Sequence, residues 1–136
     1  MTQSQERRRQ LDHVAVAVKS IEESCQLFEL LSGEVCSTPE TLSEHGVRVA
    51  FVGRLELVEP LDTNSGVGRF LQRHGQGLHH VAYRTDDLDG DLVRLKARGI
   101  EPIDQIPRAG ASGHRVAFLH PSSTDGILIE LVEHPD

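Results

Sequence analysis

The segment Leu11-Asp12-His13-Val14-Ala15 returns later in the chain as Leu78-His79-His80-Val81-Ala82. A second segment, Glu56-Leu57-Val58-Glu59-Pro60, returns as Glu130-Leu131-Val132-Glu133-His134-Pro135. The aligned histidines stand 67 positions apart, and the aligned first glutamates stand 74 positions apart. This period is too long for a solenoid of short repeats, and it indicates one supersecondary module that occurs twice.

The first copy is predicted to hold a strand, a helix and three further strands. Apolar residues alternate over 11–18, which is typical of a strand. Ser20 followed by Glu23 is a capping-box pattern that begins a helix, and Gly33 is suited to end it. The three further strands are expected near 34–38, 47–52 and 55–59.

The second copy predicts the same order of elements. A strand is expected at 79–85 and a helix at 88–98, followed by strands near 101–105, 115–120 and 126–131, and a short helix over 67–73 joins the two copies. The sequence therefore predicts an α+β fold built from two tandem βαβββ modules. We expect a flexible polar leader at 1–10 and a single domain at 11–136, with module one at about 11–62, a linker helix at about 65–75 and module two at about 78–135.

The charge and apolar content of the chain exclude several classes of protein. The 136 residues carry a net charge of −7 with no basic run longer than Arg7-Arg8-Arg9, so no nucleic-acid partner is expected. The longest apolar stretch, near 126–132, is far shorter than a bilayer span, and residues 1–10 are polar where a secretory signal is apolar. We expect a cytoplasmic protein with no membrane partner.

Cys25 and Cys36 lie in the expected helix and in the strand that follows it, without a paired spacing. In a reducing compartment such thiols stay reduced and fill small apolar spaces. The sequence therefore predicts no structural disulfide.

The repeated histidines and glutamates carry the chemistry that the sequence predicts. His13 shares its strand face with Ala15 and Ala17, and this face of small residues leaves room for a ligand. Glu130 has apolar neighbours on both faces of its strand, so it is expected to be buried, and a buried carboxylate needs a cation or a proton. Two histidines and two carboxylates predict a divalent-metal site with open coordination positions, formed by His13, Glu56, His80 and Glu130.

The second glutamate of each Glu-Leu-Val-Glu copy differs from the first. Glu59 and Glu133 follow the proposed ligands by three residues, so they point to the opposite face of the strand. We expect them to be solvated.

These motifs resemble the vicinal oxygen chelate superfamily, in which paired βαβββ modules form a curled mixed sheet around a divalent metal. Within it the chain is most similar to the methylmalonyl-CoA epimerase family. The resemblance covers about 11–135 and also rests on the segments Ser43-Glu44-His45-Gly46-Val47, Phe118-Leu119-His120-Pro121 and Gly126-Ile127-Leu128-Ile129.

The resemblance implies an isomerase of the racemase and epimerase class. Such an enzyme interconverts (2R)- and (2S)-methylmalonyl-CoA by 1,1-proton transfer through a metal-stabilised enolate. The implied cofactor is one divalent metal per chain, Co²⁺ first, with Mn²⁺, Ni²⁺ and Zn²⁺ as alternatives. The implied partners are an acyl-CoA thioester as substrate and a second copy of the chain in a homodimer.

A 1,1-proton transfer needs two acid–base groups on opposite sides of the α-carbon. Glu44 is the candidate for one side and Glu130 for the other, with His120 and His79 as alternatives for the second group. The glycine-bearing segment 106–114 is suited to close over an acyl group. Arg84 and Arg115 are candidates to bind CoA phosphates, although both also fit a solvated surface.

Three other functions fit the same motifs. A glyoxalase I acting on a glutathione hemithioacetal shares metal-assisted proton transfer. A ring-cleaving dioxygenase fits less well, because four protein ligands leave too little room on iron for both substrate and oxygen. A non-catalytic small-molecule-binding module with the same fold needs no metal, and the four intact ligand positions count against it.

Overall fold

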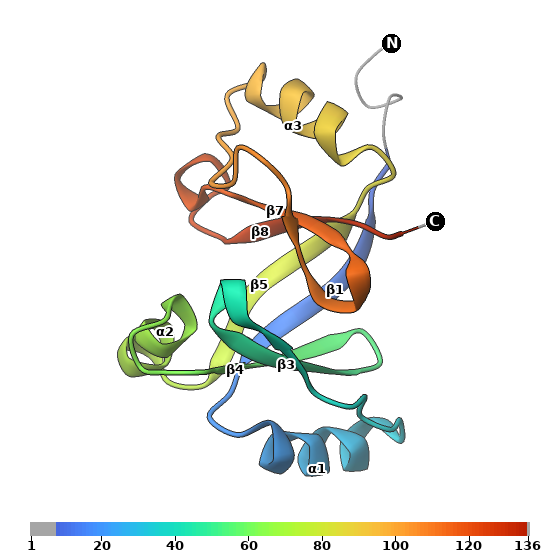
Figure 1. Cartoon of the computed structure of the whole chain (residues 1–136), viewed down its shortest axis with the longest axis vertical. Coiled ribbons are helices and arrows are strands. Elements are labelled where there is room, and N and C mark those ends of the chain that lie inside the picture. Colours follow the sequence, from blue (N-terminus) through green and yellow to red (C-terminus); the bar gives the residue numbers. More distant parts are fainter. Residues whose placement is uncertain (1–7, 136) are drawn as a thin grey trace. The chain divides into compact units, whose positions relative to one another are not determined.

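The computed structural model describes residues 8–135, which form two compact units. The first unit consists of residues 13–80, and the second consists of residues 8–12 together with 81–135. The elements, shown in Figure 1, are β1 (Gln10–Ala17), α1 (Ile21–Ser32), β2 (Glu40–Leu42), β3 (Val47–Val52), β4 (Leu55–Pro60), α2 (Gly66–His74), β5 (Gly77–Arg84), α3 (Leu88–Lys96), β6 (Arg108–Ala109), β7 (Arg115–Leu119) and β8 (Ile129–Glu133).

In the first unit the strands are ordered β2-β3-β4-β1. β1 runs parallel to β4, whereas β3 runs antiparallel to both β2 and β4. Glu56 on β4 stands opposite Ala15 on one side and opposite Phe51 on the other. The sheet of this unit is therefore mixed, as the sequence predicts.

The second unit repeats this arrangement with β5-β8-β7-β6. β5 runs parallel to β8, and β7 runs antiparallel to β8 and β6. Glu130 on β8 stands opposite Ala82 on one side and opposite Phe118 on the other. The two modules thus have the same strand register, and the predicted tandem α+β modules are confirmed.

One helix covers a face of the sheet in each unit, as seen for α1 and α3 in Figure 1. α1 packs Ile21, Cys25 and Phe28 against a cluster that contains Ala50 and Leu57 of β3 and β4. α3 packs its apolar side on β7 and β8 in a cluster of Leu88, Leu92, Ala117, Leu119 and Leu131. Burial of these apolar side chains supplies the main driving force that holds each helix on its sheet.

The last strand of each module also holds the beginning of its helix. Ser20 and Asp87 are the N-caps of α1 and α3, and their side chains accept hydrogen bonds from Glu23 N–H and Gly90 N–H. Glu59 accepts from Ile21 N–H at 3.0 Å, and Glu133 accepts from Leu88 N–H at 3.1 Å.

The expectation that Glu59 and Glu133 are solvated is therefore wrong. Each glutamate is half-buried and satisfies a helix N–H group that has no partner within the helix. Each also pairs with an arginine of the neighbouring strand, Glu59 with Arg48 and Glu133 with Arg115.

The strands predicted at 34–38 and 101–105 are not formed, and the short strands β2 and β6 occur later in the chain. In the first unit, Phe51 donates its backbone N–H to the Ser37 hydroxyl at 2.8 Å. In the second unit, Phe118 donates its N–H to the Asp104 carboxylate, also at 2.8 Å. A side-chain oxygen replaces a backbone carbonyl at these points, so the regular ladder is interrupted.

Proline marks the position where pairing resumes. Pro39 immediately precedes β2, and Pro107 immediately precedes β6. Because proline has no N–H to donate, a regular ladder cannot continue through either position. Strand propensity alone did not reveal these interruptions.

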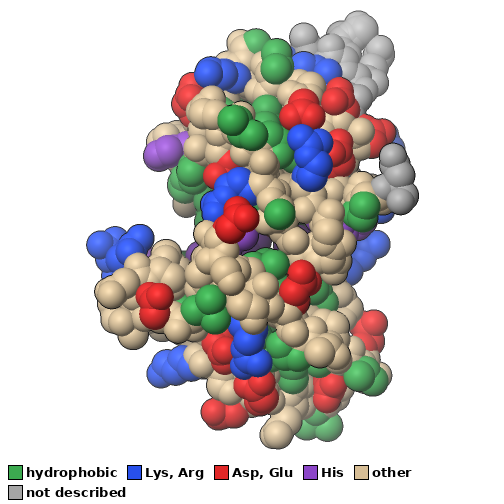
Figure 2. Space-filling model, viewed as in Figure 1, with side chains coloured by type: hydrophobic (Ala, Val, Ile, Leu, Met, Phe, Trp, Pro, Cys, Tyr) green, Lys and Arg blue, Asp and Glu red, His purple; other side chains and the backbone are tan. Residues whose placement is uncertain are grey.

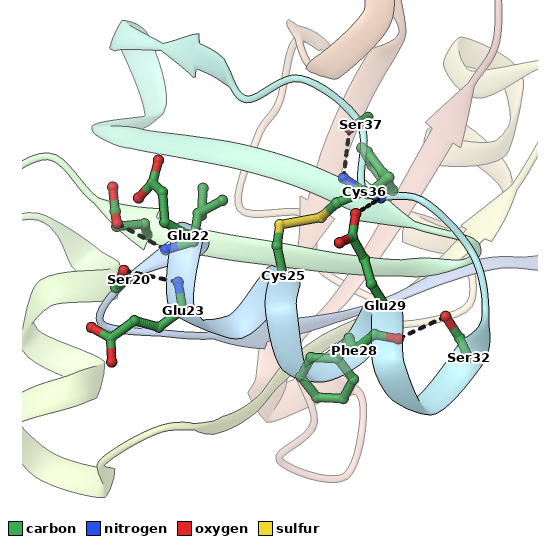
Figure 3. The surroundings of a disulfide bond; sticks show 12 residues. Ser20, Glu22, Glu23, Cys25, Phe28, Glu29, Ser32, Cys36 and Ser37 are labelled. Atoms are coloured by element: carbon green, nitrogen blue, oxygen red, sulfur yellow. Dashed lines mark hydrogen bonds between the residues drawn. A yellow bond between two sulfur atoms is a disulfide. The ribbon is translucent and has the colours of Figure 1, made fainter.

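A disulfide links Cys25 of α1 to Cys36 in the segment that follows the helix, with Cα atoms 5.9 Å apart (Figure 3). The prediction that these thiols are free is wrong. Glu29 lies one turn along the helix and accepts a hydrogen bond from Cys36 N–H at 2.6 Å, as Figure 3 shows. The folded chain thus brings together two cysteines that the sequence places in separate elements.

The predicted polar leader lies mostly outside the described residues. Arg9, which the sequence assigns to it, forms an ion pair with Asp91 of α3 at 2.9 Å, and β1 begins at Gln10. Asp91 is fully buried and also bonds Thr85 and Arg94. Burial on its own raises the pKa of Asp91, but the hydrogen bonds from Arg9, Thr85 and Arg94 outweigh it and lower the pKa to about 2.

The surface carries charges of both signs. On the face drawn in Figure 2, Lys and Arg side chains are interspersed with Asp and Glu side chains. Among residues 8–135, no helix has both the length and the apolar character needed to cross a membrane.

Candidate metal centre and active site

Three of the predicted ligands meet within the first unit. Nε2 of His13 lies 3.3 Å from Oε1 of Glu56, and Nε2 of His80 lies 3.6 Å from the same oxygen. The ligand atoms of the two histidines lie within 4.8 Å of each other. All three residues are buried, with 5%, 7% and 7% of their surfaces exposed for His13, Glu56 and His80.

The strands position these side chains through their register. His13 shares its face of β1 with Ala15 and Ala17, which are fully buried and too small to fill the space beside the imidazole. Glu56 stands opposite Ala15 in the parallel β1–β4 ladder. Phe51 contacts His13 edge to face, with ring centroids 5.5 Å apart, and forms an apolar wall beside the imidazole.

The donor set fits a divalent transition metal. Imidazole nitrogen and carboxylate oxygen are ligands for Zn²⁺, Co²⁺, Mn²⁺ and Ni²⁺, and a catalytic site keeps positions open for substrate. Two imidazole nitrogens directed at one buried carboxylate oxygen form a compact group of this kind. His13, Glu56 and His80 are therefore able to hold a divalent metal.

Glu130 occupies the corresponding place in the second unit. It is buried, with 7% of its surface exposed, and it lies in the same register on β8 as Glu56 does on β4. Burial agrees with the expectation from its apolar neighbours in the sequence. Its role as the fourth ligand stays a prediction.

The predicted acid–base groups lie in different surroundings. Glu44 is exposed in a short 3₁₀ turn, Ser43–His45, which ends at Gly46 with φ of 68° and connects β2 to β3. Gly46 also accepts a hydrogen bond from Leu61 N–H at 2.9 Å, which ties this turn to the end of β4. His120 is exposed, and its Nδ1 accepts from Ser122 N–H at 3.2 Å, so this histidine caps a turn.

The segment 106–114 carries more structure than its glycines suggest. It contains β6 and a 3₁₀ turn, Ala111–Gly113. His114 stacks on His134 with ring centroids 4.0 Å apart, and Nε2 of His134 lies 2.6 Å from Oδ1 of Asp12. These contacts join the segment to both ends of the second unit.

The two candidate arginines also differ. Arg115 is held by Glu133 at 2.6 Å and by Asp89 at 3.1 Å, so its guanidinium has a structural role. The hydrogen bonds that Arg115 donates to the carboxylates of Glu133 and Asp89 raise the pKa of its guanidinium. Arg84 lies exposed at the end of β5.

Sequence reasoning missed the immediate surroundings of His80. Nδ1 of His79 lies 2.9 Å from Nδ1 of His80, and Phe70 of α2 lies edge to face against His79 with ring centroids 4.9 Å apart. Neighbouring residues of a strand ordinarily point to opposite faces, so the pattern gave no signal of contact between the two imidazoles.

Residues 12–118 match the Glyoxalase/Bleomycin resistance protein/Dioxygenase superfamily. The chain is 41% identical over 127 residues to the uncharacterized protein YqjC of Bacillus subtilis, and the match covers 90% of this chain and 91% of that protein. It is 38% identical over 128 residues to the mitochondrial methylmalonyl-CoA epimerase of Dictyostelium discoideum, covering 90% of this chain and 77% of the relative.

A solved structure gives the same likeness in three dimensions. Methylmalonyl-CoA epimerase of Streptomyces coelicolor, in complex with 2-nitronate-propionyl-CoA, matches with a TM-score of 0.86 and 31% sequence identity. The match covers 91% of this chain and 93% of that one. The expected vicinal oxygen chelate fold is thereby confirmed. The chain belongs to the glyoxalase/bleomycin resistance protein/dioxygenase superfamily and, within it, to the methylmalonyl-CoA epimerase family of isomerases.

Proposed function

We propose that the chain is a metal-dependent epimerase that interconverts (2R)- and (2S)-methylmalonyl-CoA by moving the proton on the α-carbon. The observation that carries this proposal is the meeting of His13, Glu56 and His80 in one buried group. A second support is that the relatives of this chain include methylmalonyl-CoA epimerases.

The proposed metal ligands are His13, Glu56, His80 and Glu130, with Co²⁺ as the first candidate and Mn²⁺, Ni²⁺ or Zn²⁺ as alternatives. The shared register of Glu56 and Glu130 supports the fourth ligand, because a duplicated module presents duplicated side chains. A divalent metal, when bound, supplies a Lewis acid that makes the proton next to a thioester carbonyl easier to remove.

The chain's own carboxylates move the proton. Glu44 takes the α-proton on one face of the substrate and becomes a neutral acid. Glu130 in its protonated, unligated form, or His120 or His79 in its place, donates a proton to the opposite face, which inverts the configuration at that carbon. Net proton count is unchanged, and each group returns to its starting state by exchange with solvent.

The substrate class follows from the relatives, one of which is described in complex with a propionyl-CoA analogue. We propose an acyl-CoA thioester as the partner in solution, with no nucleic acid and no membrane. A cytoplasmic location and a homodimer belong to the same proposal, and analytical ultracentrifugation measures the oligomeric state. The cytoplasmic location gains no support from the cysteines, because Cys25 and Cys36 form a disulfide and are not free thiols.

The test is deuterium incorporation at the α-carbon of each methylmalonyl-CoA isomer in D₂O, followed by NMR with and without a chelator. The metal-loaded protein should incorporate deuterium from either isomer, interconvert the two, and lose both activities in the chelator. The doubly substituted His13→Ala/His80→Ala protein is the matched control, because it removes both imidazoles from the proposed site.

Two results contradict the proposal in different ways. Metal-loaded protein that gives no exchange, but isomerises a glutathione hemithioacetal, is a glyoxalase I. Protein that gives neither reaction and purifies without tightly bound metal is a small-molecule-binding module.

A further inference from the structure

We propose that His79 is a positioning residue that fixes the imidazole of His80 in the form that can bind a metal. This inference rests on the proposed function, since it concerns the same metal site. It starts from the distance of 2.9 Å between Nδ1 of His79 and Nδ1 of His80. Their ring planes are tilted by 76°, with centroids 5.2 Å apart.

A hydrogen bond between two imidazole nitrogens needs one donor and one acceptor. If Nδ1–H of His80 donates, the neutral ring has a lone pair on Nε2, the atom that lies 3.6 Å from Glu56 Oε1 in the candidate metal group. The opposite assignment places the proton of His80 on Nε2, where it blocks ligation. Because only the first assignment leaves Nε2 of His80 able to ligate, the proposed metal site assigns His79 as the acceptor, and its presence then favours the ligand form of His80.

The surroundings of His79 support this role. Phe70 packs edge to face on the His79 ring at 4.9 Å, and both residues are half-buried. Phe70 belongs to α2, whose N-cap Ser65 accepts a hydrogen bond from Gly68 N–H at 3.0 Å. A capped helix thus holds the aromatic ring that limits the movement of His79.

The first module uses the equivalent position differently. Asp12 precedes His13 as His79 precedes His80, and its carboxylate pairs with Nε2 of His134 at 2.6 Å. His79 instead directs a ring nitrogen at the neighbouring ligand. The residue before the proposed histidine ligand is thus Asp12 in the first module and His79 in the second, and only His79 contacts the ligand that follows it through a ring nitrogen.

The experiment compares three variants of the full chain. His79→Phe removes the acceptor and keeps a flat ring against Phe70, whereas His79→Asn keeps an oxygen acceptor near the position of Nδ1. His74→Phe is the matched control, because His74 is exposed and also contacts Phe70, with centroids 4.8 Å apart. The probe is Co²⁺ alone, and the readout is its dissociation constant from competition with a chromophoric chelator.

We expect His79→Phe to weaken Co²⁺ binding by about 10- to 100-fold, the range found when the hydrogen-bond partner of a metal ligand is removed. His79→Asn should stay within about 3-fold of the unsubstituted protein, and His74→Phe should be unchanged. In metal-free protein, ¹⁵N NMR of labelled histidine should show His80 protonated at Nδ1, with that preference lost in His79→Phe.

Folded His79→Phe that binds Co²⁺ as tightly as the unsubstituted protein overturns the inference, as does His79→Asn that binds as weakly as His79→Phe. In both cases the unsubstituted protein still binds Co²⁺, so the metal part of the proposed function survives. If the unsubstituted protein binds no Co²⁺, the proposed metal site itself fails, and the NMR spectrum still decides the protonation of His80.

Discussion

The Oε1 atom of Glu56 lies 3.3 Å from the Nε2 atom of His13, although the two residues come from different strands of the first module. The contact joins β1 to β4 on the face where small alanines leave space beside the imidazole. Because of this contact, substitution of Glu56 tests the proposed metal site in the first module.

We predict that Glu56→Leu weakens Co²⁺ binding by at least about 100-fold, since loss of a ligand should exceed loss of a partner that only orients one. Glu56→Gln keeps an oxygen at the same position but removes its charge, so a smaller loss of about 10-fold is expected. Isothermal titration with Co²⁺ measures both, and circular dichroism checks that each variant is folded. Tight binding by Glu56→Leu would remove Glu56 from the ligand set.

Glu44→Gln should abolish proton exchange while leaving the metal content intact. The amide cannot accept the α-proton, and removal of a general base lowers a rate by about 100-fold or more. Deuterium incorporation and metal analysis of the same sample provide the two readings. Glu40→Gln is the control, because Glu40 is an exposed carboxylate of the neighbouring strand β2. Unchanged exchange in Glu44→Gln eliminates Glu44 as the base.

Asp91 should make the stability of the fold depend on acidity between about pH 4 and pH 2. Its pKa is about 2 in the folded chain and 3.8 in a model group, so its ionised form stabilises the fold above pH 4. That contribution, about 2 kcal/mol, is lost as the pH falls through this window. Urea unfolding at pH 7 and at pH 2 should show a smaller loss for Asp91→Asn than for the unsubstituted chain.

Asp86→Asn provides the comparison for that experiment, because Asp86 is an exposed carboxylate in the turn before α3. It should keep the acid sensitivity of the unsubstituted protein. An Asp91→Asn protein that loses as much stability in acid as the unsubstituted chain would show that other groups control this window.

Reduction of the Cys25–Cys36 bond should lower the free energy of unfolding by about 3 kcal/mol. The cysteines are separated by 11 positions, and opening a loop of that size returns conformational entropy to the unfolded chain. Differential scanning calorimetry with and without a phosphine reductant measures the change. A Cys25→Ala/Cys36→Ala protein should be insensitive to the reductant, and an oxidised chain that melts no higher than the reduced one contradicts the estimate.

Much of the fold could be predicted from alternation and end signals. The period of two in β1 and the capping pattern at Ser20 located the first strand and helix within one or two residues. β2 and β6 could not be located in this way. The side chains of Ser37 and Asp104 accept hydrogen bonds from backbone N–H groups of the neighbouring strands, where a strand would use its backbone carbonyls. Such hydrogen bonds depend on which segments meet, and a local pattern holds no information about that.

The candidate site divides in the same manner. The duplicated motif identified His13, Glu56 and His80 by their residue types and spacing, and the structure brings these three together. The sequence by itself determined the βαβββ modules and the chemical nature of the proposed ligands, because periodicity and residue type are properties of the chain. Only the tertiary structure decided that Cys25 pairs with Cys36, that Glu59 holds the start of α1 and that His79 contacts His80. Those partners are set by the packing of helix on sheet and by side-chain rotamers, which depend on the whole fold.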